Sequence, residues 1–467
     1  MDRKIKILGI IGSIRSNYKH IDQLKEIIND SESIEDLVKL IKKSKINFSN
    51  TDISVSFSMM GAKKFGAKID LISITDIFTH DKLDIYYNLL KYDSIDDINE
   101  IDTLSIDVNG LDRLLKKVLW ADGIVMGTPV YFGDRSSVAN KFLQLTRKYD
   151  SLKGKAFGIV SVGAKRNGGQ ETANIYSLYE ALMQGAVVVG DGPEISQYGG
   201  TVWAGDTGDA INDYYGAKTC FGVGRQVCQL SRILKKGNIE NKTKLKVTFL
   251  LTMDTEDKKY EKILRNYTCS VSKDNNIYIV ICNLIDNDIY RCIACNICPL
   301  PGTEDRFKKD DYPYKCVIRT KKDDMKKIQK ILVESDCVVI AGVNSQEELI
   351  YRYQAFMERT RFIRRDHFEL TNIPIIGLLI NELGANSNQI FNLKVLSSFI
   401  RHNTFFLKPL EIYLYNNKII FENNFKELIP LINSIKIGRS LVEPVEISYK
   451  ATGYKYKDLD YTFKKRK

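Results

Sequence analysis

The chain has little of what would place it in a membrane or in an oxidising compartment. Its longest apolar runs, such as Ile5–Ile11 and Val338–Val343, are far shorter than the roughly 20 residues that a transmembrane helix needs. The first of these runs passes directly into Gly-Ser-Ile-Arg and lacks the pattern of a cleavable signal peptide. Nine cysteines in a chain of 467 residues without such a signal argue against a disulfide framework. We therefore expect a cytoplasmic protein without a membrane span.

Histidine is also scarce, and its distribution argues against several classes of site. The sequence holds only His20, His80, His367 and His402, each isolated from the others. No Ser–His–Asp arrangement and no histidine spacing typical of a metal site occurs, so we interpret all four as surface or structural residues. No nucleic-acid-binding module accompanies the net charge of +11. We interpret that charge as solvated basic surface, with attraction of an anionic cofactor as the alternative.

Short apolar runs alternate with helical patterns along most of the chain. The runs have the length and composition of strands buried on both faces of a parallel sheet. In the first half they are Lys4–Ile11, Ala67–Ile74, Gly123–Met126, Ala156–Val162 and Ala186–Val189. In the second half they are Leu245–Thr252, Ile277–Leu284, Cys337–Gly342, Ile375–Ile380 and Phe405–Leu407. The repeated alternation predicts an α/β protein with two doubly wound parallel sheets.

The same pattern predicts the domain boundaries. Domain one covers residues 1–236, domain two covers residues 243–436, and residues 437–467 form a basic C-terminal arm. Domain one carries a helical insertion at 16–48 and an acidic, aromatic insertion at 75–109, both longer than ordinary connections.

Two polar segments of domain one predict a phosphate site. Gly12-Ser13-Ile14-Arg15 directly follows the first strand, and Ser49-Asn50-Thr51 opens the next long helix. Ligands bind at the carboxyl ends of parallel strands, and a helix start offers free N–H groups to an anion. Together the segments read as one phosphate cradle split by the insertion. Each alone is equally typical of an ordinary turn or helix cap, and Ser16-Asn17 is a rival for the second segment.

Two further loops of domain one predict a site for a planar ring. Residues 127–133 read Gly-Thr-Pro-Val-Tyr-Phe-Gly, in which the proline fixes a turn and the glycines permit close approach. Tyr131 and Phe132 supply planar surface. A second glycine-rich loop, from Gly163 to Gly169, follows the fourth strand and would lie beside the first.

These segments, in this order, resemble the flavodoxin-like NADPH-dependent FMN reductase family, which includes quinone reductases and iron–sulfur flavoproteins. The matching residues are 12–15, 49–51, 66–70, 121–133, 141–142 and 168–172. The resemblance implies FMN as cofactor, NAD(P)H as co-substrate, flavin-borne chemistry without a catalytic side chain, and a homodimer or homotetramer. It implies FMN contacts from Ser13, Arg15, Ser49, Asn50, Thr51, Pro129, Val130, Tyr131, Phe132, Gly133, Gly163, Ala164, Gly168 and Gly169.

Domain two lacks the flavin loops and carries a cysteine cluster after its second strand. Cys292, Cys295 and Cys298 are spaced by two residues each, and Cys316 follows after 17 more. Three thiolates this close suit a 4Fe–4S cluster that a fourth completes, while zinc and unligated thiols are alternatives. The iron–sulfur members of the family carry a similar compact motif at this place. Asp254 and Glu256 follow the first strand of domain two and would repel a phosphate, so we expect no FMN there.

The sequence therefore predicts a flavin oxidoreductase. FMN in domain one would take electrons from NAD(P)H and pass them to a quinone, a small acceptor or the cluster. One alternative is a non-catalytic electron carrier for a partner redox enzyme, and another is a zinc-stapled structural or regulatory protein. Lys165 and Arg166 would bind a nicotinamide phosphate, stabilise the reduced flavin or form a solvated loop. Trp203 would cover the flavin from a neighbouring subunit or pack in the core.

Overall fold

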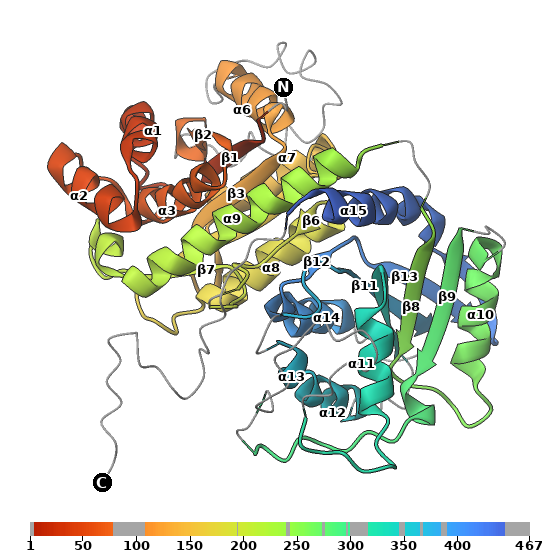
Figure 1. Ribbon diagram of the computed structural model, residues 1–467. Helices are drawn as coiled ribbons and strands as arrows, with labels where there is room; N and C mark the ends of the chain where they lie inside the picture. Colours follow the sequence, from red (N-terminus) through yellow and green to blue (C-terminus); the bar gives the residue numbers. More distant parts are fainter. Residues whose placement is uncertain are drawn as a thin grey trace, which may run out of the picture. The chain divides into compact units, whose positions relative to one another are not determined.

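The computed structural model describes residues 4–77, 108–193, 195–239, 243–272, 276–295, 298, 316–344, 351–364, 368–383 and 390–443. It divides into two compact units, residues 1–235 and 236–467, called here the N-terminal and C-terminal units (Figure 1). No helix of the described residues has the length and apolar character needed to cross a membrane. Most of the 75–109 insertion, His80, His367 and residues 444–467 lie outside the described residues.

The N-terminal unit is built on a parallel sheet with the strand order β2-β1-β3-β5-β6. Its strands are β1 Lys6–Ile11, β2 Lys68–Ser73, β3 Gly123–Tyr131, β5 Ala156–Gly163 and β6 Val187–Val188. When the main strands are numbered along the chain, this is the order 2-1-3-4-5 of flavodoxin-like folds. The order in which strands are added to the sheet changes direction between β1 and β3. A short strand, β7 (Gly200–Trp203), also pairs with β5, and β4 (Asp134–Arg135) pairs with β3.

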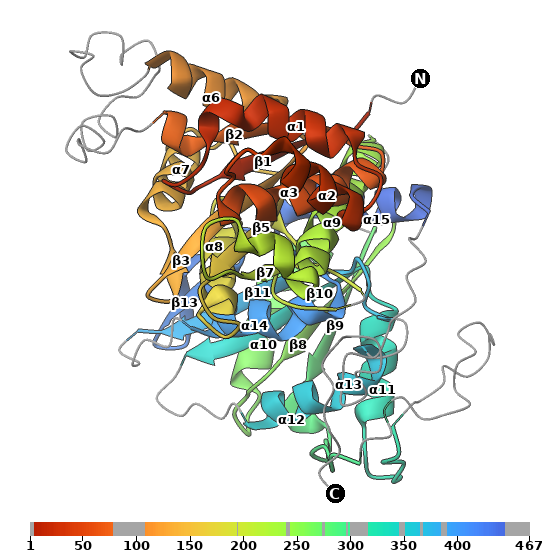
Figure 2. The same ribbon diagram turned by 90° about the vertical axis from the view of Figure 1, so that its left-hand side faces the viewer.

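Helices cover this sheet, and two of them come from the 16–48 insertion. The helices are α1 Ile21–Asp30, α2 Ile34–Ser44, α3 Asn50–Lys64, α6 Val108–Trp120, α7 Ser137–Lys148, α8 Gln170–Met183 and α9 Tyr214–Gly237. The insertion forms α1 and α2, two amphipathic helices that pack beside α3 (Figures 1 and 2). Helices α3 and α9 cross at backbone contact, because a Cβ on Gly224 would lie 1.7 Å from the Ser58 carbonyl oxygen.

The C-terminal unit has a parallel sheet with the order β9-β8-β10-β11-β12, which is again 2-1-3-4-5 along the chain. Its strands are β8 Leu245–Leu251, β9 Ile277–Asn283, β10 Cys337–Asn344, β11 Pro374–Glu382 and β12 Phe405–Phe406. An added hairpin, β13 Leu410–Tyr415 with β14 Lys418–Glu422, joins the sheet through β11. The helices are α10 Lys259–Ser272, α11 Met325–Val333, α12 Tyr351–Arg359, α13 Arg361–Arg364, α14 Phe391–Phe399 and α15 Ile429–Leu441. The predicted fold class, two doubly wound flavodoxin-like sheets, is confirmed.

The structure differs from the sequence-based expectation in several elements. The third strand does not end at Met126 but continues to Tyr131, so Pro129 lies within β3 and the predicted turn at this proline is wrong. The chain turns instead at Phe132 and Gly133, with φ of 52° and 79°, and returns as β4. The long helix α9 and the β13–β14 hairpin were not predicted. Helix α15 runs past the predicted boundary at residue 436 to Leu441.

Candidate functional site

Three of the predicted flavin loops converge at one edge of the N-terminal sheet. The backbone N–H of Gly12 donates to the Gly127 carbonyl at 2.8 Å, which joins the loop after β1 to the end of β3. A Cβ on Gly169 would lie 2.8 Å from Gly133 Cα, so the loop after β5 touches the β3–β4 turn. Gly169 has a φ of 95°, which favours glycine at this contact. The segments around residues 12–15, 129–133 and 163–169 therefore form one continuous surface.

The phosphate segments are tied together at the first turn of α3. Ser49 is the N-cap of this helix: its Oγ accepts from the N–H of Asp52 at 3.2 Å, and its own N–H donates to Asp52 Oδ2 at 2.8 Å. Asn50 spans to the loop before η3 (Asp209–Asn212), with Nδ2 donating to the Asp206 carbonyl at 2.8 Å and Oδ1 accepting from the Ala210 N–H at 3.0 Å. The Asn50 side chain is therefore held by the protein on both its oxygen and its nitrogen, while Ser49 Oγ accepts one hydrogen bond and keeps its own O–H as a donor.

Two backbone N–H groups in the first turn of α3 are not used in hydrogen bonds within the described part of the protein. Among the described residues, the structure shows no hydrogen-bond partner for the N–H groups of Asn50 and Thr51, as at the first positions of any α-helix, and such groups can bind an anion. Ser13 is buried and Arg15 is exposed in the neighbouring loop, with the Arg15 N–H donating to Ser13 Oγ at 3.3 Å. Unpaired amides, a hydroxyl and a guanidinium form a donor set that fits a phosphate group.

The alternative to the Ser49–Thr51 segment for phosphate binding was Ser16-Asn17. Ser16 Oγ donates to Asp52 Oδ1 at 2.7 Å, and the Asn17 N–H donates to Asp52 Oδ2 at 3.0 Å. Burial raises the pKa of Asp52, while the hydrogen bonds from Asn17, Ser16 and Ser49 act against that rise. Asp52 was not recognised from the sequence, where it reads as an ordinary acidic residue in a first helical turn.

The loop that would face a ring presents exposed aromatic side chains. Pro129 and Val130 are half-buried, Tyr131 is 51% exposed, and Phe132 is fully exposed at the tip of the hairpin. Positive φ values at both turn residues match the two-residue turns that suit a twisted hairpin. The structure therefore offers planar surface at this edge of the sheet through a hairpin rather than through a proline turn.

The loop after β5 is held in place by one buried amide side chain. Gln170 Nε2 donates to the carbonyls of Lys165 at 2.6 Å and Val202 at 3.1 Å, and its Oε1 accepts from the Gly168 N–H at 2.8 Å. Trp203 donates from Nε1 to the Ala164 carbonyl at 3.0 Å and is 47% exposed, so it borders this loop and is not a core residue. Gln170 and Trp203 thus fix the conformation of the segment from Gly163 to Gly169.

The two basic residues of this loop behave differently. Arg166 forms an ion pair with the buried carboxylate of Asp213 and donates to the Thr201 carbonyl at 3.2 Å. These contacts anchor the Arg166 side chain to the protein, so Arg166 is not part of a simply solvated loop. Lys165 is exposed beside it.

The corresponding turn of the C-terminal unit is filled by a carboxylate of the chain. Asp254 follows β8 and is buried, with Oδ1 accepting from the N–H groups of Thr255 and Tyr260, both at 2.9 Å. Its Oδ2 accepts from Asn283 Nδ2 at 2.7 Å and from the Glu261 N–H at 3.3 Å. The first turn of α10 thus already holds an internal anion at the position that corresponds to the phosphate segment.

Three of the predicted metal-binding cysteines, Cys292, Cys295 and Cys316, are close enough to the fourth, Cys298, to act on its thiol electrostatically. Burial, together with the neighbouring thiols of Cys316, Cys295 and Cys292, raises the pKa of the Cys298 thiol to about 11. Cys316 is buried, while the other three are half-buried. Within the described residues, no three His, Cys, Asp or Glu side chains converge in metal-binding geometry. The all-thiol donor set fits a soft metal or an iron–sulfur cluster.

A buried ion pair supports the segment that leads into this cluster. Arg359 Nη2 contacts Asp323 Oδ2 at 2.7 Å and Arg359 Nη1 contacts Asp323 Oδ1 at 3.1 Å, with the side chains 1% and 2% exposed. Arg359 Nη1 also donates to the Tyr290 carbonyl at 2.7 Å, and the Tyr290 N–H donates to Asp323 Oδ1 at 3.3 Å. Neither residue was singled out for this role from the sequence, because the two lie on different elements.

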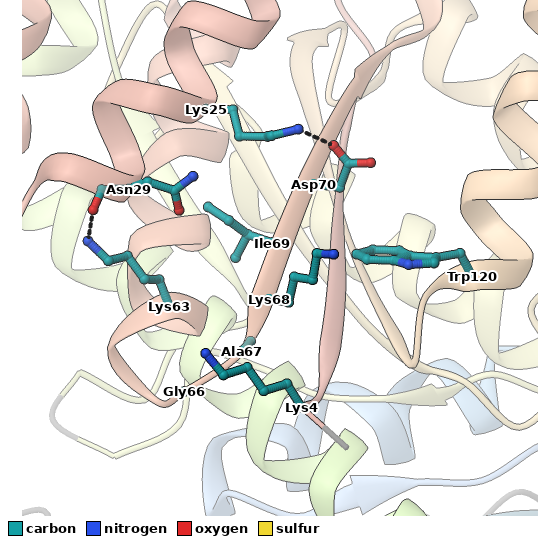
Figure 3. A pocket seen from close by; sticks show the side chains of 10 residues that line it. All are labelled: Lys4, Lys25, Asn29, Lys63, Gly66, Ala67, Lys68, Ile69, Asp70 and Trp120. Carbon is teal, nitrogen blue, oxygen red and sulfur yellow. Dashed lines mark hydrogen bonds and ion pairs between the residues drawn. The ribbon is translucent and has the colours of Figure 1, made fainter. Parts of the chain in front are cut away.

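A cavity of about 680 Å³ lies at the other end of the N-terminal sheet (Figure 3). It is lined by the start of β2 and by α1 and α3, and several of its side chains are lysines. Lys25 and Lys117 pair with Asp70 at 3.1 and 2.7 Å, and Lys63 donates to the Ser31 carbonyl at 2.7 Å. The cavity is therefore separate from the flavin loops, which follow the last residues of the strands, and part of its positive charge is already neutralised.

Comparisons with known proteins show which families the chain is similar to. The family model described as NADPH-dependent FMN reductase matches residues 5–198. Over 134 residues the chain is 37% identical to an iron-sulfur flavoprotein of Methanocaldococcus jannaschii, covering 28% of this chain and 68% of that protein. It is 34% identical over 129 residues to an NAD(P)H dehydrogenase (quinone) of Geobacter sulfurreducens, covering 24% and 62%. The chain thus spans about two thirds of the length of these curated relatives.

Among solved structures, the chain is similar to RosB with a bound 8-demethyl-8-formylriboflavin-5'-phosphate intermediate. The identity is 16%, the TM-score is 0.32, and the match covers 50% of this chain and 80% of that one.

Proposed function

Because the chain belongs to the NADPH-dependent FMN reductase family, a family of flavin-dependent oxidoreductases, we propose that its N-terminal unit binds FMN and oxidises NAD(P)H. The observation that carries the proposal is the convergence of the loops after β1, β3 and β5 beside a helix start with two unpaired N–H groups. When bound, FMN supplies the hydride and electron transfer, so the protein needs only to hold and orient it.

The residues divide into phosphate and ring contacts. Ser13, Arg15 and the N–H groups of Asn50 and Thr51 would hold the phosphate, and Ser49 would act by capping α3. The ring would lie between residues 129–133 and the segment formed by Gly163, Ala164, Gly168 and Gly169. Exposed Tyr131 and Phe132 on one side and Trp203 on the other support a planar ligand here.

The proposal extends to the C-terminal unit as an electron-transfer partner. Cys292, Cys295, Cys298 and Cys316 would hold a 4Fe–4S cluster, and the similarity to the iron-sulfur flavoprotein of Methanocaldococcus jannaschii supports an iron–sulfur centre. The terminal acceptor would be this cluster, a quinone or another small molecule. We further propose a cytoplasmic homodimer or homotetramer that binds neither nucleic acid nor membrane.

An absorption spectrum and a turnover assay on the purified full chain test this proposal. We expect flavin bands after incubation with FMN, iron in the metal analysis, and oxidation of NADPH or NADH with a quinone as acceptor. Bound FMN without NAD(P)H oxidation would favour an electron carrier that serves a partner enzyme. A colourless chain that contains zinc and does not bind FMN would contradict the proposal and favour a zinc-stapled structural or regulatory protein.

A further inference from the structure

One buried carboxylate joins the two ends of the 16–48 insertion. Asp52, in the first turn of α3, is completely buried. Its Oδ1 accepts from Ser16 Oγ at 2.7 Å, and its Oδ2 accepts from the N–H groups of Asn17 at 3.0 Å and Ser49 at 2.8 Å. Ser16 and Asn17 precede α1, whereas Asp52 follows α2, so the hydrogen bonds from Ser16 and Asn17 close the loop that the insertion opens. The bond from Ser49 belongs to the capping box of α3 and fixes Asp52 at the start of that helix.

The insertion makes such a closure necessary. The loop that carries Ser13 and Arg15 and the helix start that carries Asn50 and Thr51 are separated in sequence by α1 and α2. The chain itself therefore does not keep the two segments together. A carboxylate that accepts three hydrogen bonds holds them at fixed distances, because bonds to an ionised acceptor are shorter and stronger than neutral ones.

We infer that Asp52 is a positioning residue that assembles the divided phosphate cradle of the FMN site without touching the ligand. This inference rests on the proposed function. In it, Asp52 sets the distance between Ser13 and Arg15 on one side and the free N–H groups of Asn50 and Thr51 on the other. The carboxylate also places a negative charge next to the phosphate, so geometry and charge act in opposite directions on affinity.

Two substitutions separate geometry from charge. In Asp52→Asn, the amide oxygen can accept from the N–H groups of Asn17 and Ser49, and its NH₂ can donate to Ser16 Oγ, whose hydroxyl hydrogen rotates. This variant keeps the connections and removes the charge, so FMN should bind at least as tightly as in wild type. Asp52→Ala leaves three buried donors without an acceptor and should weaken FMN binding by about 10- to 100-fold.

Dissociation constants for FMN and riboflavin, measured by quenching of flavin fluorescence, test the inference on the full chain. Riboflavin lacks the phosphate, so its affinity should change less than about threefold in Asp52→Ala. Ser56→Ala is the matched control, because Ser56 is buried on the same helix and donates only to the Ile53 carbonyl within it. If Asp52→Ala does not fold, Ser16→Ala removes one of the three hydrogen bonds and should weaken FMN binding but not riboflavin binding.

These measurements distinguish a failure of the inference about Asp52 from a failure of the proposed FMN binding. Wild-type chain that binds neither flavin contradicts the proposed function, and the inference falls with it. Wild-type chain that binds FMN while Asp52→Ala or Ser16→Ala binds it equally well overturns the inference alone. An equal loss of FMN and riboflavin affinity, not restored in Asp52→Asn, would also overturn it, because Asp52 would then support the fold and not the cradle.

Discussion

Replacing Asp323 by asparagine should lower the free energy of unfolding of the C-terminal unit by about 3–5 kcal/mol, the usual cost of breaking a buried ion pair. The structure gives the reason for a value in this range. The pair is bidentate, with N–O distances of 2.7 and 3.1 Å, and its two side chains are 1% and 2% exposed. The neutral amide would leave the Arg359 guanidinium charged and buried without its counterion. Because Arg359 also holds the Tyr290 carbonyl, two residues before Cys292, the variant should also retain less metal.

Hydrogen exchange of peptides from β10 measures the change in unfolding free energy, since the exchange of these amides reports unfolding of the C-terminal unit. Arg359→Met should cost a similar amount, and the double variant Asp323→Leu with Arg359→Met should cost clearly less than the sum of the single changes, because it leaves no unpaired charge. The control is Lys246–Glu334, an ion pair of the same unit at 2.8 Å with side chains 26% and 48% exposed. Glu334→Gln should cost at most about 1 kcal/mol. The reasoning is refuted if Asp323→Asn costs no more than this control, or if the two single changes are additive.

Three further changes test other parts of the molecule. Gly169→Ala should weaken FMN binding measured by fluorescence, because φ is 95° and the new Cβ would lie 2.8 Å from Gly133 Cα. The control is Gly154→Ala, where φ is 71° and the new Cβ meets no other atom of the described residues; it should lower stability but leave FMN affinity unchanged. Burial lowers the pKa of His402 from 6.5 to about 3, so between these pH values the unfolded chain binds a proton that the folded chain does not. The unfolding free energy should therefore fall by up to about 5 kcal/mol as the pH drops from 6.5 to about 3. His402→Gln should flatten the dependence of the unfolding free energy on pH. Cys316→Ser should lower the iron content measured by mass spectrometry, and an unchanged content would exclude Cys316 as a ligand.

The strands could be predicted because their signal is local, whereas their order in the sheet was implied only by the resemblance to flavodoxin-like proteins. Strands buried on both faces are continuous apolar runs, and both sheets follow that pattern, as in Cys337–Asn344, which is buried throughout. The position of the flavin loops also followed from the sequence, because the carboxyl ends of parallel strands lie at one edge. The two insertion helices were visible for the same reason, since Leu24 and Ile28 or Leu37 and Ile41 repeat at helical spacing.

What the sequence did not reveal depends on contacts between distant residues. Pro129 was expected to turn the chain, but β1 pairs with β3 only as far as Ile11 opposite Gly127. Beyond that point β3 has an open side, and a proline is tolerated in a strand edge. Asp52 and Gln170 likewise look like ordinary helix residues until folding brings their distant partners to them. Such long-range hydrogen bonds have no periodic pattern that a single sequence could display.

The carboxylate of Asp254 gives the two halves of the chain a different dependence on their surroundings. An anion that belongs to the polypeptide cannot dissociate, so the first turn of α10 is satisfied at any concentration of small molecules. A ligand bound at the first turn of α3 would instead add RT ln(1 + [L]/Kd) to the unfolding free energy of the N-terminal unit alone. The supply of this ligand would then set how long the N-terminal unit resists proteolysis, whereas the first turn of α10 does not depend on it.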